Sequence, residues 1–339
     1  MAASLPVLAV FVGYERMKAR KDGSPLVQLR LFGQRAFSVG IAIALTFFLG
    51  VTSFTLILTL FLQIGLGFTP LHAGLTFLPF SAGVLVASAA AARLAPRFGR
   101  GVTMTGALVM SAGMGALLLI VRHYGQAVTT TELLPALVVA GLGMGAVLAP
   151  LADIILAGVR QDDAGSASGV FNTAVQIGAS IGIAVIGVIF FGQLGTQSAP
   201  AASAVAPQLR GALTAAGLPR AATAPVVTAF RGCLHDRLVS TDPAATPASC
   251  RSATAGRLPV TARREIAAIG RRATGIDFAA SVWRTLLFQV GVFLASFAMM
   301  LALPAARRRG RRAPSAVAGA GEADRLAVEP AYARVQEVD

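Results

Sequence analysis

Charged side chains are scarce in this sequence of 339 residues. They make up 13% of it, against roughly 25% in an average soluble domain, while 55% of the residues are hydrophobic and the mean hydropathy is +0.71. The charges are also segregated, because no ionisable residue lies between Arg35 and His72 or between Arg100 and Arg122. This composition excludes an ordinary soluble domain.

Side chains that carry enzyme chemistry are equally sparse. The three histidines stand singly, and the sequence has no Gly-x-x-x-x-Gly-Lys phosphate loop, no HExxH pair and no cysteine-rich metal cluster. We therefore expect no catalytic residues, no metal site, no cofactor and no enzymatic activity. Any work that the protein does is expected to draw on an ion gradient rather than on bound ATP.

Long apolar runs dominate instead. An α-helix needs about 20 apolar residues to cross the hydrocarbon core of a bilayer, and these runs lack the alternation of β-barrel strands. The sequence therefore predicts an all-α polytopic membrane protein. Its six full spans are expected at residues 36–66, 73–95, 101–121, 133–159, 164–193 and 283–306.

The two ends of the chain differ from these spans. Residues 1–14 are apolar but would form a helix of only about 21 Å, and positive charge follows them, the reverse of a signal peptide. We interpret them as the inner end of a truncated transmembrane helix. Residues 307–339 begin with RRRGRR and then read as a disordered tail.

Arginine and lysine predict the orientation, because short basic loops stay in the cytoplasm. We therefore attribute the net charge of +14 to basic residues that orient the chain in the membrane, and not to nucleic-acid binding. The expected protein is a multi-pass bacterial plasma-membrane protein with a cytoplasmic C-terminus and a long extracellular loop at 194–282. The cytoplasmic segments are 15–35, 96–100, 160–163 and 307–339, and the expected cytoplasmic anchors are Arg93, Arg97, Arg100 and Arg160.

Polar side chains recur along one face of two spans. They step by three or four residues, as Thr52, Thr55, Thr59 and Gln63 do, and as Ser168, Asn172, Gln176 and Ser180 do. Polar groups in hydrocarbon turn to the bundle interior or to a water-filled cavity. The candidate substrate-cavity residues are Thr52, Thr55, Thr59, Gln63, Asn172 and Gln176. The alternative is bonding between helices or, for threonine, to the preceding turn.

Asp153 is the one ionisable residue within 133–159, and it continues a row of small residues, Gly141, Gly145 and Ala149. Such a row permits close approach of another helix. One interpretation is a carboxylate near the inner interface, paired with Arg160 or Arg93. The other is a protonatable, proton-coupling group that lines the inward cavity.

The only two cysteines, Cys233 and Cys250, lie in the long segment that we place outside the cell. An oxidising exterior favours a disulfide between them; two free thiols are the alternative.

Four motifs in order resemble the C-terminal part of the fourteen-helix drug/proton antiporters of the major facilitator superfamily. They are SPLVQLRLFGQRAFSVG, LFLQIGLGFTPLHAGLTFLP, GLGMGAVLAPL and GSASGVFNTAVQIGASIGIAVIG. The resemblance implies proton-coupled export of drugs or other small amphipathic compounds. The family's cytoplasmic loop pattern, Gly-x-Leu-Ala-Asp-Arg-x-Gly-Arg, is present here in the weakened form ARLAPRFGR (92–100). Because Pro96 replaces the aspartate of that pattern, the resemblance implies no gating role for this position.

The six spans form two triplets of opposite orientation, which is the 3+3 inverted-repeat plan of one transporter half. We expect the chain to be a fragment that lacks its N-terminal half, and to need that half or self-association to transport. A non-transporting scaffold, left by a truncated transporter gene, is the alternative.

Overall fold

The computed structural model describes residues 28–240, 247–254 and 260–302, with five single positions among the first 17 residues. The tail 307–339 and nearly all of 1–27 lie outside the described residues. Within the described ranges no strand occurs, and six helices are long and apolar enough to cross a membrane. The chain is an all-α polytopic membrane protein, as its hydrophobic runs predict.

Each predicted span overlaps one long helix, and the first also includes η2 (Phe61–Gly65). These helices are α2 (Arg35–Leu60), α3 (Pro70–Phe98), α4 (Arg100–Tyr124), α5 (Thr130–Leu156), α6 (Ala164–Ala215) and α9 (Val260–Leu301). Two more helices, α7 (Arg220–Val239) and α8 (Ala248–Thr254), lie between α6 and α9. The short turns are η1 (Leu29–Gly33), the π-helical η2 (Phe61–Gly65), η3 (Gly125–Ala127) and η4 (Gln161–Asp163).

Local sequence explains where several helices begin and end. Pro70 opens α3 after Thr69, whose hydroxyl accepts a hydrogen bond from the His72 N–H at 3.2 Å. Thr129 and Glu132 form a capping box at the start of α5. A single residue, Gly99, separates α3 from α4, and its φ of +53° is a conformation that glycine adopts without strain.

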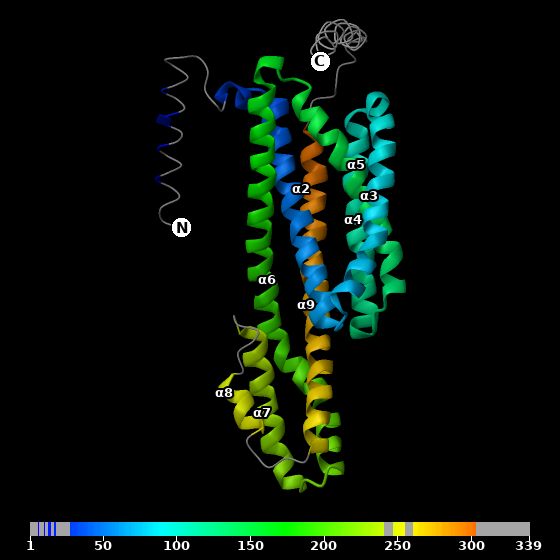
Figure 1. Ribbon diagram of the computed structural model, residues 1–339, viewed down its shortest axis with the longest axis vertical. Helices are drawn as coiled ribbons and strands as arrows, with labels where there is room; N and C mark the ends of the chain where they lie inside the picture. The colour runs from blue at the N-terminus through cyan, green and yellow to red at the C-terminus, as the bar shows by residue number, and fades with distance from the viewer. Residues whose placement is uncertain are drawn as a thin grey trace, which may run out of the picture. The chain divides into compact units, whose positions relative to one another are not determined.

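Much of the helix packing is preserved when the first triplet (α2, α3, α4) is exchanged for the second (α5, α6, α9), except that α6 and α9 pack together more extensively than α3 and α4. Helix α3 packs on α5 as α6 packs on α2, and α4 packs on α5 as α9 packs on α2. The pair α4 and α9 also contact each other. Figure 1 shows α2, α6 and α9 beside the group of α3, α4 and α5. This is the relationship expected between two inverted repeats.

Glycine allows the two equivalent crossings to be close. Gly178 and Gly182 of α6 lie against the backbone carbonyls of Leu45 and Leu49 of α2, where an added Cβ would clash. Gly141 and Gly145 of α5 meet the carbonyls of Phe80 and Val84 of α3 in the same way. Small residues let helix backbones approach inside a membrane, and the sequence predicts this packing for both pairs.

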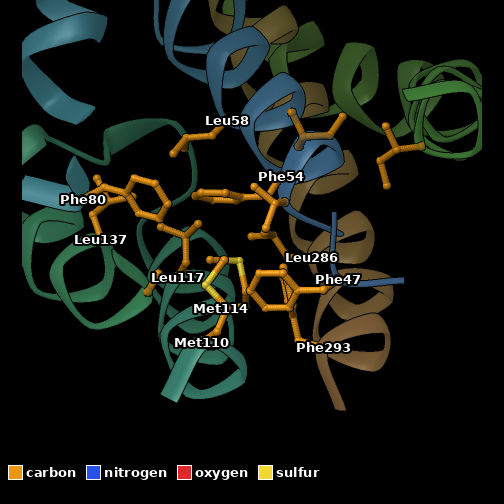
Figure 2. Packing of buried hydrophobic residues seen from close by; sticks show 14 of the residues in the cluster. Phe47, Phe54, Leu58, Phe80, Met110, Met114, Leu117, Leu137, Leu286 and Phe293 are labelled. Atoms are coloured by element: carbon orange, nitrogen blue, oxygen red, sulfur yellow. The ribbon is translucent and has the colours of Figure 1, made fainter. Parts of the chain in front are cut away.

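Aromatic and methionine side chains fill the space between the two helix groups (Figure 2). The Phe47 ring of α2 lies 5.5 Å from that of Phe293 of α9, and the Phe54 ring lies 5.7 Å from that of Phe80 of α3. Both are within the range of favourable ring pairs. The Phe54–Phe80 pair therefore joins the two helix groups, and the Phe47–Phe293 pair joins the two triplets.

Helices α6 and α9 are longer than a bilayer needs. Their 52 and 42 residues correspond to about 78 and 63 Å of helix, against a hydrocarbon core of about 30 Å. Following the predicted orientation, we call the end at Arg35 the inner end, and the end that carries α7 and α8 the outer end (Figure 1).

The segment 194–282, expected as a loop, is largely helical. The outer parts of α6 and α9 pack with α7 around a separate apolar cluster that includes Leu209, Phe230 and Ile269. The structure joins Cys233 of α7 to Cys250 of α8 by a disulfide, the pairing that the sequence predicts. We call the outer parts of α6 and α9, together with α7 and α8, the outer helices.

Candidate functional site

An open groove of about 430 Å³ runs along α6. Its polar lining comes from the row predicted for that span, with Asn172 and Gln176 both exposed. The Asn172 amide donates to the Ser168 carbonyl at 3.1 Å, whereas the Gln176 side chain makes no hydrogen bond within the described residues. The groove is lined by Asn172, Thr173, Gln176, Ile177, Ser180 and Ile181.

The polar row on α2 is less open. The hydroxyls of Thr55 and Thr59 donate to carbonyls one turn earlier, at 3.1 and 2.7 Å, so the alternative of bonding to the preceding turn describes these two. Thr52 and Gln63 are half-buried and make no side-chain hydrogen bond within the described residues. Although α2 and α6 pack together, the structure does not bring the α2 residues into the groove.

Asp153 is exposed at the inner end of α5. Arg160, one of its two expected partners, instead lies 3.3 Å from Asp162, and both of these side chains are exposed. In the described part of the chain no ion pair joins Asp153 to Arg160 or to Arg93. The structure therefore shows Asp153 near the inner end but without the expected arginine partner among the described residues, and both interpretations of the residue stay predictions.

The expected anchors lie around the same inner end. Arg93 and Arg97 are exposed near the end of α3, and Arg100 begins α4. This placement is compatible with contacts to lipid headgroups, although the same residues would occur there in any protein with this orientation.

Arg30 and Asp163 form an ion pair that sequence reasoning missed. The Arg30 Nη2 lies 2.8 Å from both Asp163 carboxylate oxygens, and the Asp163 side chain is buried. The two residues are 133 positions apart, so no local pattern indicates the contact.

A buried polar row on α9 was also missed. Asp277, Ser281, Thr285 and Gln289 are all 0% exposed and recur every four residues. With its amide nitrogen facing α2, Gln289 donates to the Gly50 carbonyl and accepts from the Phe54 N–H, each at 3.1 Å. The spacing of four was the available signal, but the first two members fell within the segment assigned to the outer loop.

Metal ligands do not gather in this structure. Among the described residues, no group of three or more His, Cys, Asp or Glu side chains is placed to hold a metal ion. The site therefore offers hydrogen-bonding and apolar surface, together with single carboxyl groups.

The architecture defines a polytopic helical membrane protein built from two inverted triplets, with a groove along one helix that is lined by polar and apolar side chains. The family model of the Major Facilitator Superfamily matches residues 2–183, and the chain belongs to this family.

Known relatives of this chain carry transporter names. It is 37% identical over 305 residues to the probable actinorhodin transporter of Streptomyces coelicolor, covering 90% of this chain and 52% of that protein. It is 32% identical to the multidrug resistance protein Stp of Mycobacterium tuberculosis, over 57% of this chain and 34% of the relative. It is 31% identical to the multidrug efflux pump LfrA of Mycolicibacterium smegmatis, over 51% and 34%. The chain spans about half of the first relative.

Proposed function

We propose that this chain forms one six-helix bundle of a proton-coupled exporter of small amphipathic compounds in the cell membrane. The names of the relatives support a transporter rather than an enzyme. The proposal places the C-terminus and the inner end in the cytoplasm, and the outer helices outside the cell.

The α6 groove is the observation that carries this proposal. Its exposed amides would be costly against lipid, so the groove needs a facing surface. Alternating access in this class requires two bundles that rock about a site between them. We therefore propose that an N-terminal transporter half, or a second copy of the chain, faces the groove and that substrate binds between the two.

Proteoliposomes with a proton gradient provide the test, with ethidium, a fluorescent amphipathic cation, as the probe. We expect exchange of ethidium for protons when the chain is paired with an N-terminal bundle or with itself, and none from a demonstrated monomer. Gln176→Ala should weaken exchange, whereas Gln197→Ala, on the same helix but outside the groove, should not. If the paired bundle neither binds nor exchanges any of a panel of amphipathic dyes, the exporter proposal fails. The non-transporting membrane scaffold is then the remaining alternative.

Cysteine labelling of intact cells tests the orientation. Thr228→Cys on α7 should react with a membrane-impermeant reagent added outside, and Gln161→Cys in η4 should react only after permeabilisation. The reverse pattern contradicts the proposed topology.

A further inference from the structure

Asp277 of α9 is buried, and in the described part of the chain it has no partner. It is 0% exposed, and neither of its carboxylate oxygens is hydrogen-bonded to another described residue. The hydroxyl of Ser281, one turn further along α9, is also buried and has no partner among those residues. Buried polar groups in proteins are almost always hydrogen-bonded, so two such groups on one helix face call for a bound species.

The neighbours of Asp277 along α9 place it at the outer end of the bundle. Gly275 lies close to the Gly65 carbonyl in η2 and to the Gln126 side chain in η3. The Phe278 ring lies 5.5 Å from the Phe190 ring of α6. The neighbours of Gly275 and Phe278 are therefore an aromatic ring, an uncharged amide and backbone. With its amide turned, Gln126 also accepts from the Arg272 Nε at 3.3 Å.

Two of the cations nearest in sequence, Arg272 and Arg284, are engaged elsewhere. Arg272 donates to Gln208 at 3.1 Å, and Arg284 donates to Gln193 at 3.2 Å. Arg284 also lies 5.4 Å from the centre of the Trp283 ring, as does Arg122 of α4. Within the described residues, no ion pair joins Arg271, Arg272 or Arg284 to Asp277.

The elements packed against α9 carry few other titratable groups. The turns η2 and η3 contain no titratable residue. The remaining ones are Arg35 on α2, Arg210 on α6, Arg100, Arg122, His123 and Tyr124 on α4, and Arg220, Arg231, His235, Asp236 and Arg237 on α7. Within the described residues, none of them forms an ion pair with Asp277.

We propose that Asp277 is a proton-binding site of this protein, with Ser281 beside it on the same face of α9. An isolated buried carboxylate is costly, whereas a neutral carboxylic acid costs far less and gains an O–H donor. The proton comes from the outer solution and adds to one carboxylate oxygen. The polar row then continues to Gln289, about 18 Å further along α9, where it bonds the backbone of α2. Coupling of this proton to export rests on the function proposed above.

Infrared difference spectroscopy of the full chain in lipid nanodiscs tests the site without any transport assay. The wild-type protein should show the C=O band of a protonated carboxylic acid at neutral pH. Asp277→Asn should abolish that band, whereas Asp162→Asn, which changes an exposed carboxyl with no proposed role in proton coupling, should leave it. Asp277→Glu, which keeps an acid at the position, should retain a shifted band and serves as a second variant should the asparagine protein not fold.

Three results would overturn the assignment. The first is that the wild-type protein shows no such band, and the second is that the band persists in Asp277→Asn. The third is that the wild-type band disappears when sodium is added at constant pH, which would indicate a metal-cation site. The band is independent of transport. A protein that shows it but fails to exchange ethidium therefore disproves the exporter proposal alone, while proton-driven exchange that Asp277→Asn leaves unchanged disproves the coupling.

Discussion

Arg30 and Asp163 connect the segment before α2 to the start of α6. One guanidinium nitrogen bonds both carboxylate oxygens at 2.8 Å, and the Asp163 side chain is 4% exposed against 55% for Arg30. The Gln28 N–H donates to the Ser166 hydroxyl at 3.0 Å beside this pair. Because Asp163 directly precedes α6, its charge also lies at the positive end of the helix dipole. The inner ends of α2 and α6 are therefore held together by charge and by hydrogen bonding.

Arg30→Ala should destabilise the protein. The substitution leaves a buried carboxylate without its cation, and because Arg30 is half exposed we expect a loss of about 1–3 kcal/mol in unfolding free energy, less than for a fully buried pair. Unfolding of the purified protein in detergent measures this. Arg160→Ala breaks an exposed pair and is the control, with an expected change of about 0.5 kcal/mol or less. Equal stability of Arg30→Ala and wild type would contradict the role of the pair.

Gly178→Ala should loosen the crossing of α6 on α2. The new methyl group would meet the backbone carbonyl of Leu45, which cannot rotate away, and overpacking of this kind costs about 1–3 kcal/mol. Gly187→Ala is the matched control on the same helix, because open space surrounds that position. It should be neutral or stabilising by up to about 1 kcal/mol, since alanine is the better helix former. Similar melting temperatures for the two variants would be inconsistent with a close crossing.

Removal of the Cys233–Cys250 disulfide should loosen the outer helices. The bridge closes a segment of 17 residues, which corresponds to about 3 kcal/mol in the chain-entropy account. Non-reducing mass spectrometry of protein kept oxidised should find the linked peptides. Amide hydrogen exchange should rise in α7 and α8 of Cys233→Ser and leave α2 to α5 unchanged. Alkylatable thiols at both positions would exclude the bridge.

Asp153→Asn should leave folding intact, because the side chain is exposed and bonds nothing in the described residues. A stability change within about 0.5 kcal/mol is expected for such a surface position. If Asp153 couples protons to export, ethidium exchange by the paired bundles should lose its dependence on the proton gradient. Exchange with unaltered pH dependence returns this residue to a purely structural role.

The sequence by itself determined the features that depend on local composition. Apolar runs of about 20 residues have one stable arrangement in a bilayer, a spanning helix, so all six spans were predictable from hydropathy. The step of four between Gly178 and Gly182 likewise indicates close packing, because such residues share a helix face whatever the partner. The disulfide needed only two cysteines and an oxidising compartment.

The outer helices show where composition misleads. Residues 194–282 are rich in alanine, proline, threonine and serine and resemble a loop. Short helices of this kind are marginal alone, yet Leu209, Phe230 and Ile269 bury one another once α6, α7 and α9 are packed side by side. Helix formation there is a result of tertiary packing.

Only the tertiary structure decided which polar residues are buried. In sequence Asp153 is the single carboxyl of an apolar span, whereas Asp277 lies in a segment that resembles a loop. Yet Asp153 is exposed, and Asp277 is buried without a partner among the described residues. The Arg30–Asp163 pair joins residues far apart in the chain, and the opening of the α6 groove depends on which face α2 covers. Burial and pairing depend on contacts between distant segments, and no periodicity within one helix specifies them.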